Sequence, residues 1–200
     1  MKLTYELEEK YASEGYAVIC GTDEAGRGPL AGDVFAAAVI LPRGLDVDGL
    51  NDSKKISEKK REKLFDIIRE QAVSFGIASA SPGEIDEINI LNAAQLAMRR
   101  AVAMVDPAPD LVLVDGNVVR GFTVKAVPII KGDAISPSIA AASILAKVSR
   151  DRQCLELDAL YPGYGFAKHK GYPTRDHMDA VRKLGPCPVH RASFLKFLDK

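Results

Sequence analysis

A short apolar run, residues 17–20, leads into two acids and a glycine-rich turn, and this order constrains the fold more than any other stretch. The run is typical of a buried strand, and Asp23 and Glu24 follow where that strand is expected to end. Next comes Gly26-Arg27-Gly28, a turn that lets another backbone or a ligand approach closely. Carboxylates suit hard cations such as Mg²⁺, and arginine suits phosphate. The segment therefore indicates metal-assisted chemistry at a phosphate group.

The composition describes one ordinary globular domain. The chain has 200 residues, of which 47% are hydrophobic, enough for a sizeable core. The 27 basic and 27 acidic residues cancel, so a nucleic-acid partner would require positive charge that is gathered locally. Residues 54–63 and 168–175 are the two places that qualify. We expect a single domain over residues 1–200, with a core of about 16–160 and a helical extension of about 161–200.

Other features exclude several classes of protein. No apolar run approaches the roughly 18 residues that a membrane span needs, and the charged N-terminus has no signal-peptide core. We therefore expect a cytoplasmic protein without membrane association, and nothing in the sequence demands more than a monomer. The three cysteines contain no Cys-x-x-Cys pair, which argues against a disulfide framework or a structural zinc site. Cys187-x-x-His190 is a fragment of a metal motif and is best explained as coincidence.

The periodicity predicts an α/β domain with a mixed sheet and a helical C-terminal part. Residues 33–41 follow the first strand as a hairpin partner, and Pro128 argues against a central position for its own strand. A capping box at Ser81 and Glu84 opens a short helix. Further strands are expected at 73–80, 111–115 and 122–130, and further helices at 57–72, 89–105 and 137–153.

Four acids stand at positions typical of a catalytic site. Asp115 ends an apolar strand in the way expected for Asp23 and Glu24, and Asp133 precedes the alanine-rich helix. Sites in open α/β sheets gather at strand ends and adjacent helix starts. Carboxylates that share a pocket repel one another unless protons or a cation compensate, and a divalent metal is the simplest compensation. Taken alone, Asp115-Gly116 is an ordinary turn and Asp133 an ordinary helix-start residue.

Six segments carry a resemblance to bacterial ribonuclease HII, in that family's order and over about residues 16–194. The segments are Gly21–Gly32, Asn51–Lys55, Val114–Gly116, Lys131–Asp133, Ser138–Lys147 and Tyr161–Tyr172. The resemblance implies a ribonuclease H-like fold: a mixed five-stranded sheet flanked by helices, with a helical C-terminal extension. An aspartate as the fourth acid is typical of type HII, because the related type HIII usually has a glutamate there.

The resemblance also implies an activity and its metal ligands. The expected enzyme cuts the RNA strand of RNA–DNA hybrids and incises 5′ of single ribonucleotides in duplex DNA, leaving a 5′-phosphate and a 3′-hydroxyl. Asp23, Glu24, Asp115 and Asp133 fall on the family's metal-binding carboxylates. The implied chemistry is two-metal hydrolysis with Mg²⁺ or Mn²⁺, two ions being bound with substrate.

The implied substrate contacts fall into two groups. One reads the sugar: Gly26, Arg27 and Gly28 match a turn that detects the 2′-hydroxyl through backbone groups, and Tyr172 matches a tyrosine placed against the next sugar. The second group lies along the nucleic-acid backbone and contains Lys54, Lys55, Ser143, Lys147 and Arg150. Ser143, Lys147 and Arg150 share one helix face by their spacing. The family commonly has proline at the position of Asp33, which we do not expect to be a ligand.

Two other functions compete with the nuclease. A nucleic-acid-binding module without catalysis is disfavoured because all four carboxylates are present. A small-molecule phosphate enzyme is disfavoured because the chain has neither a P-loop nor Rossmann glycine spacing.

Overall fold

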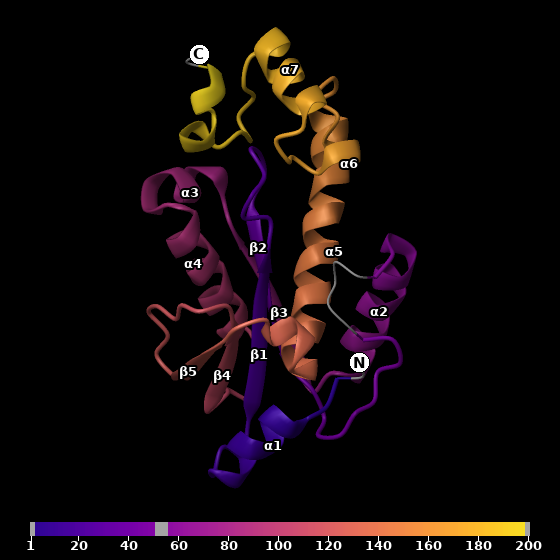
Figure 1. The fold of residues 1–200 in the computed structure, drawn as a ribbon, viewed down its shortest axis with the longest axis vertical. Coiled ribbons are helices and arrows are strands. Elements are labelled where there is room, and N and C mark those ends of the chain that lie inside the picture. Colours follow the sequence, from indigo (N-terminus) through magenta and orange to yellow (C-terminus); the bar gives the residue numbers. More distant parts are fainter. Residues whose placement is uncertain (1–2, 51–55, 199–200) are drawn as a thin grey trace.

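Five strands form one mixed sheet at the centre of the structure, a computed structural model that describes residues 3–50 and 56–198 (Figure 1). The strands lie in the order β3-β2-β1-β4-β5. Their bounds are Ile19–Ala25 for β1, Val34–Ile40 for β2, Ser74–Ala80 for β3, Leu111–Asp115 for β4 and Lys125–Ile129 for β5. β1 pairs antiparallel with β2 and parallel with β4. The predicted mixed five-stranded sheet and its opening hairpin are confirmed.

Helices cover both faces of the sheet. α5 packs on β1 and β2 from one side, with α2 beside it, and α4 packs on β1, β2 and β3 from the other (Figure 1). Alternation along β2 explains both layers, since Ala37 and Val39 face the α5 core while Ala36 and Ala38 face the α4 core. The helices are α1 Glu6–Ser13, α2 Glu58–Gln71, α3 Pro82–Ile88, α4 Ile90–Val102, α5 Pro137–Leu160, α6 Phe166–His169 and α7 Arg175–Leu184.

Local signals placed several elements correctly. Ser57 caps α2, and Ser81 with Glu84 forms the predicted capping box of α3. Pro128 lies in β5, which is an edge strand, where the missing N–H group is tolerated.

Two expectations were wrong in extent, and one helix was not expected. β1 does not end before the acids but continues through Asp23 and Glu24 to Ala25, because β2 still pairs with it there. α5 ends at Leu160 and not at 153, since residues 154–160 are also good helix formers. Helix α1, which the sequence analysis did not predict, precedes β1.

Helix α1 fixes the start of α5. The buried carboxylate of Glu8 accepts hydrogen bonds from Ser136 Oγ at 2.5 Å and from the Ser138 amide at 3.3 Å. An acid at a helix N-terminus satisfies free N–H groups and complements the helix dipole. The first turn of α5 then touches β1, where Gly21 leaves no room for a side chain against the backbone of Ser138 and Ile139. This contact sets the position of α5 over the sheet.

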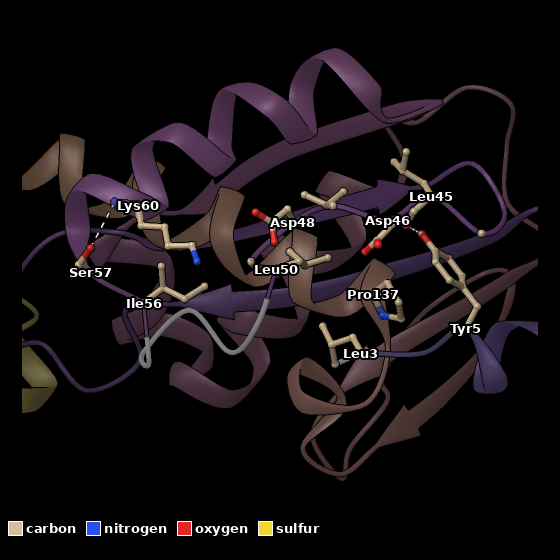
Figure 2. Close-up of a pocket in the computed structure, with 13 residues that line it drawn as sticks. Leu3, Tyr5, Leu45, Asp46, Asp48, Leu50, Ile56, Ser57, Lys60 and Pro137 are labelled. Atoms are coloured by element: carbon tan, nitrogen blue, oxygen red, sulfur yellow. Dashed lines mark hydrogen bonds between the residues drawn. The ribbon is translucent and has the colours of Figure 1, made fainter. Parts of the chain in front are cut away.

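A hollow of about 560 Å³ opens beside the start of α5 (Figure 2). Its walls include Tyr5, Asp46, Asp48, Lys60 and Pro137. None of the predicted site residues that the structure describes lines it. The predicted substrate residues Lys54 and Lys55 lie outside the described residues. No helix in the described part of the chain is long and apolar enough to cross a bilayer.

Candidate active site

A second pocket, of about 480 Å³, brings most of the predicted site residues together. The residues that line it are Asp23, Glu24, Ala25, Gly26, Arg27, Gly28, Pro29, Asp115, Ser143, Lys147, Arg150, Asp151, Lys170 and Tyr172. They come from β1 and the turn that follows it, the end of β4, the middle of α5 and the segment after α6. The sheet thus supplies the acids, α5 supplies a polar wall, and the C-terminal part closes the third side.

The sheet register explains why three acids meet. The parallel β1–β4 ladder ends at Thr22 and Val114, so Asp115 stands at the end of β4 beside the continuing β1. Asp23 pairs with Ala37 and faces α5, as alternation requires. By alternation, the Glu24 side chain leaves the strand on the opposite face of the sheet. It nevertheless lines the same pocket, because β4 has ended beside this part of β1 and leaves the edge of the strand open.

Burial and mutual repulsion raise the pKa of two of these acids. The pKa of Asp23 is raised well above its usual range, first by burial and then by the charges of Glu24 and Asp115. Hydrogen bonds from Ser143 and from the Glu24 amide, the latter at 2.7 Å, oppose this rise. Burial also raises the pKa of Glu24, although Arg27 at 3.2 Å partly offsets it. The negative charges of these neighbouring acids therefore oppose one another unless a proton or a cation lies between them.

Asp133 is tied to the other acids through its neighbour. The Gly132 amide donates to Asp115 Oδ1 at 2.7 Å, and Lys131 turns the chain with a φ of 56°. Asp133 follows in a single 3₁₀ turn, next to the pocket but not among the residues that line it. Within residues 3–50 and 56–198, no three His, Cys, Asp or Glu side chains are close enough together to hold a metal ion. Three of the four acids line one pocket, and Asp133 directly follows the glycine whose amide bonds Asp115.

The two predicted sugar-reading elements touch each other. A Cβ atom on Gly28 would lie 3.4 Å from the ring atom Cε1 of Tyr172, so the ring packs directly over this glycine. The ring is nonetheless 45% exposed, which leaves part of it free for a ligand. Its backbone is fixed, because the Tyr172 amide donates to His169 O at 3.0 Å.

The polar face of α5 lines the pocket as its spacing predicts. Ser143 hydrogen-bonds Asp23, and Lys147 Nζ donates to Asp151 Oδ1 at 2.6 Å. Arg150 is buried, and its Nη2 donates to Ala31 O at 2.9 Å and to Lys170 O at 3.1 Å. These contacts make Arg150 a link between the turn after β1 and the C-terminal part. Its phosphate contact stays a prediction.

Sequence reasoning missed Arg191. This residue is fully buried behind the Gly26–Asp33 loop and donates hydrogen bonds to carbonyl oxygens of that loop. It lies 158 or more positions away along the chain from each loop carbonyl that its guanidinium binds. No local sequence pattern predicts such a long-range contact. The one hint in the sequence is that Arg191 follows His190 in a short segment with few other charges.

Three buried histidines behind Tyr172 were also missed. His177 Nδ1 donates to Tyr172 O at 3.0 Å, because a carbonyl can only accept. Its Nε2 must then accept from His190 Nε2, 3.2 Å away. The Cys187 amide donates to His190 Nδ1 at 3.0 Å, which fits the same tautomer. These hydrogen bonds require neutral imidazole rings at His177 and His190. Burial lowers the pKa of His177 to about 4.

The neutral, buried histidines predict that the folded protein loses stability in acid. The His177 pKa lies below its unfolded value of 6.5, so the unfolded chain takes up the proton first. The stabilisation is complete above pH 6.5 and is lost as the pH falls toward about 4. We expect the free energy of unfolding to drop by an amount on the order of 1–3 kcal/mol across this range. Urea unfolding at several pH values measures it, and the same slope in His177→Gln would contradict the assignment.

Comparisons with known proteins point to one family. The sequence model of the ribonuclease HII family matches residues 20–197. A ribonuclease HII from Ruminiclostridium cellulolyticum is 57% identical over 190 residues, which cover 95% of this chain and 74% of that protein. Another from Caldicellulosiruptor bescii is 53% identical and covers 96% of this chain and 93% of that protein.

The chain belongs to the ribonuclease HII family.

Solved structures support the fold of this ribonuclease HII. The ribonuclease H2 of Pyrococcus horikoshii superposes with a TM-score of 0.74 at 24% identity, over 92% of this chain and 97% of that one. A ribonuclease HIII, Bst-RNase HIII, solved with Mn²⁺, superposes with a TM-score of 0.63 at 18% identity, over 91% of this chain and 64% of that one. The protein is thus a ribonuclease H of type HII, a hydrolase that cuts the RNA strand of RNA–DNA hybrids.

The turn after β1 gives a prediction for this enzyme. Gly26 has a φ of 98°, and a Cβ atom there would lie 2.7 Å from Arg150 Nε. Gly26→Val should therefore displace the turn and lower kcat/KM on a hybrid substrate at least about 100-fold, a loss that displacement of a site by about 1 Å can cause. Steady-state cleavage measures it. Activity within about threefold of wild type would contradict a tight role for this turn.

Proposed function

We propose that this ribonuclease HII also incises 5′ of single ribonucleotides in duplex DNA, leaving a 5′-phosphate and a 3′-hydroxyl. The observation that carries the proposal is the shared pocket. Three of the acids (Asp23, Glu24 and Asp115), the Gly26-Arg27-Gly28 turn and Tyr172 all line one cavity. A single 2′-hydroxyl bound at the turn would thus place one phosphate beside the acids. A reader of isolated ribonucleotides needs only this one contact, because the 2′-hydroxyl distinguishes RNA from DNA.

No three acids of the described residues lie close enough here to enclose a metal ion, but their carboxylates are the ligands that a divalent cofactor, Mg²⁺ or Mn²⁺, prefers. Asp23, Glu24, Asp115 and Asp133 would hold it, two ions being expected with substrate bound. All four supply hard oxygen ligands, and the repulsion of Asp23 by the charges of Glu24 and Asp115 supports a cation among them. Such ions, when bound, activate water and stabilise charge on the phosphate oxygens.

The protein's own side chains orient these parts. Ser143 hydrogen-bonds Asp23 and fixes its carboxylate. The Gly132 amide holds Asp115 Oδ1 in the same way. Lys147 and Lys170 line the pocket and place positive charge where a nucleic-acid backbone would pass. These contacts carry no base information, which suits an enzyme that reads sugar type.

A cleavage assay tests the proposal. End-labelled duplexes with one ribonucleotide, with an RNA–DNA hybrid stretch or with DNA alone are incubated with Mg²⁺, Mn²⁺ or EDTA. We expect incision only 5′ of the ribonucleotide and within the hybrid, only with metal, and with a 3′-hydroxyl that a polymerase extends. Cleavage of the hybrid without incision at the single ribonucleotide would reject the proposal and leave the family assignment intact. A cytoplasmic role in removing ribonucleotides from DNA belongs to the same proposal.

A further inference from the structure

All five N–H groups of the Arg191 guanidinium are used on one loop. Nε donates to Gly32 O at 2.9 Å. Nη1 donates to Pro29 O at 2.8 Å and Arg27 O at 3.1 Å, and Nη2 donates to Gly26 O at 2.7 Å and Asp33 O at 3.2 Å. Arginine has five such donors in a rigid plane, so its capacity is exhausted. The loop Gly26–Asp33 is therefore wrapped around a single buried cation.

Burial of this cation is costly, and the loop carbonyls that accept its five hydrogen bonds offset much of that cost, aided by the charges of Asp33 and Asp86. The Arg191 side chain is fully buried and no carboxylate forms an ion pair with it among the described residues. Burial, with the nearby Arg150, lowers its pKa to about 9. A charged group in such a place needs every hydrogen bond it can form. The carbonyl oxygens of the loop consequently have little freedom to turn away.

Fixed carbonyls also fix the amides on the other side of the same peptide planes. In a trans peptide the C=O and the following N–H point in opposite directions. With Gly26 O and Arg27 O turned to Arg191, the amides of Arg27 and Gly28 point away from it. Neither amide donates to another residue in the described part of the chain. Gly26, Arg27 and Gly28 line the active-site pocket, whereas Arg191 does not.

We propose that Arg191 is a positioning residue for ribose recognition, which holds the Arg27 and Gly28 amides ready to bind the 2′-hydroxyl. The inference rests on the proposed function of the Gly26-Arg27-Gly28 turn and adds the element that orders it. Lysine cannot replace this arginine, because one ammonium nitrogen has three donors and cannot span five carbonyls.

The test compares sugar preference in Arg191→Lys and wild type. Fluorescence anisotropy measures the affinity for a duplex with one ribonucleotide and for the matching DNA duplex, with Ca²⁺ in place of Mg²⁺ and gels to check that the duplex stays intact. We expect the preference for the ribonucleotide duplex to fall about tenfold or more, the effect of one or two misplaced hydrogen bonds. Affinity for the DNA duplex should stay within about twofold, since phosphate contacts are unchanged. Arg182→Lys, an exposed arginine of α7, is the matched control and should keep the wild-type preference.

A second variant keeps the test decisive if Arg191→Lys fails to fold. Arg191→Ala is assayed with and without ethylguanidinium, which returns the donor fork, and recovery of the preference supports the proposal. A wild-type preference in Arg191→Lys would overturn it, as would two variants that are unfolded by circular dichroism at room temperature, because Arg191 would then hold the fold and not the turn. Equal binding of both duplexes by wild type would instead overturn the proposed function of the turn.

Discussion

Asp23→Asn is expected to abolish cleavage and at the same time to stabilise the metal-free protein. Asp23 is 6% exposed and faces two further carboxylates, so its charge is unfavourable in the folded state. Asparagine keeps the size and the acceptor for the Glu24 amide but removes that charge. We expect kcat/KM on a hybrid to fall at least about 10³-fold and the melting temperature in EDTA at neutral pH to rise.

The stability gained by Asp23→Asn should depend on pH in a defined direction. A carboxyl whose pKa is raised by folding favours the protonated folded state, so ionisation costs stability as the pH rises above 3.8. The advantage of Asp23→Asn should therefore shrink as the pH falls toward that value. Asp66→Asn, an exposed acid of α2, is the control and should change neither activity nor melting. A destabilised Asp23→Asn, or one that retains turnover, would contradict the role of Asp23.

Gly21→Ala is expected to be among the most destabilising single methyl additions in the chain. A Cβ atom on Gly21 would lie 2.3 Å from Ser138 C and 2.4 Å from Ile139 N. Both atoms are backbone at the start of α5, so no side chain can rotate away. The helix must move off the sheet, which costs about 1–3 kcal/mol or more. Activity should fall as well, because the same helix carries Ser143 and Lys147.

Urea unfolding measures this effect against a matched control. Gly83 lies in the first turn of α3, and a Cβ atom there would meet only Ser81 Oγ at 3.9 Å. Gly83→Ala should therefore be neutral or slightly stabilising, since alanine favours helix more than glycine does. Equal stabilities of the two variants would show that α5 does not depend on its contact with Gly21.

The sheet and the three pocket acids could be predicted because their signals are local. The apolar runs of β2 and β4 identify strands, and Asp115 at the end of the second run marks the edge of the sheet. The family resemblance then pointed to Asp133 as a fourth acid and to the sugar-reading role of Gly26-Arg27-Gly28 and Tyr172, which stay predictions. The wrong end of β1 has the opposite cause: Asp23 and Glu24 look like loop residues, and only pairing with β2 keeps them in a strand.

What could not be predicted depends on contacts between distant parts of the chain. Arg191 resembles any arginine in a short loop until the fold brings the Gly26–Asp33 carbonyls around it. The three histidines do not have the spacing of paired metal ligands in the sequence. Their cluster, with its hydrogen bonds, forms only when α6, α7 and the segment around His190 come together in the fold. Glu8 likewise caps a helix 128 residues further along the chain.

The hydrogen bonds between the Gly26–Asp33 loop and residues 189–191 also determine the order in which parts of the site form during protein synthesis. Leu30 O accepts from the Arg191 amide and Gly32 N donates to Val189 O, in addition to the guanidinium bonds. A nascent chain carries all four acids by residue 133, long before Arg191 leaves the ribosome. Domains begin to fold from the N-terminus during synthesis, so the sheet can form while the loop is still without its partner. The acids are thus made first, and the loop proposed to read the sugar receives its hydrogen-bond partners only when residues 189–191 emerge.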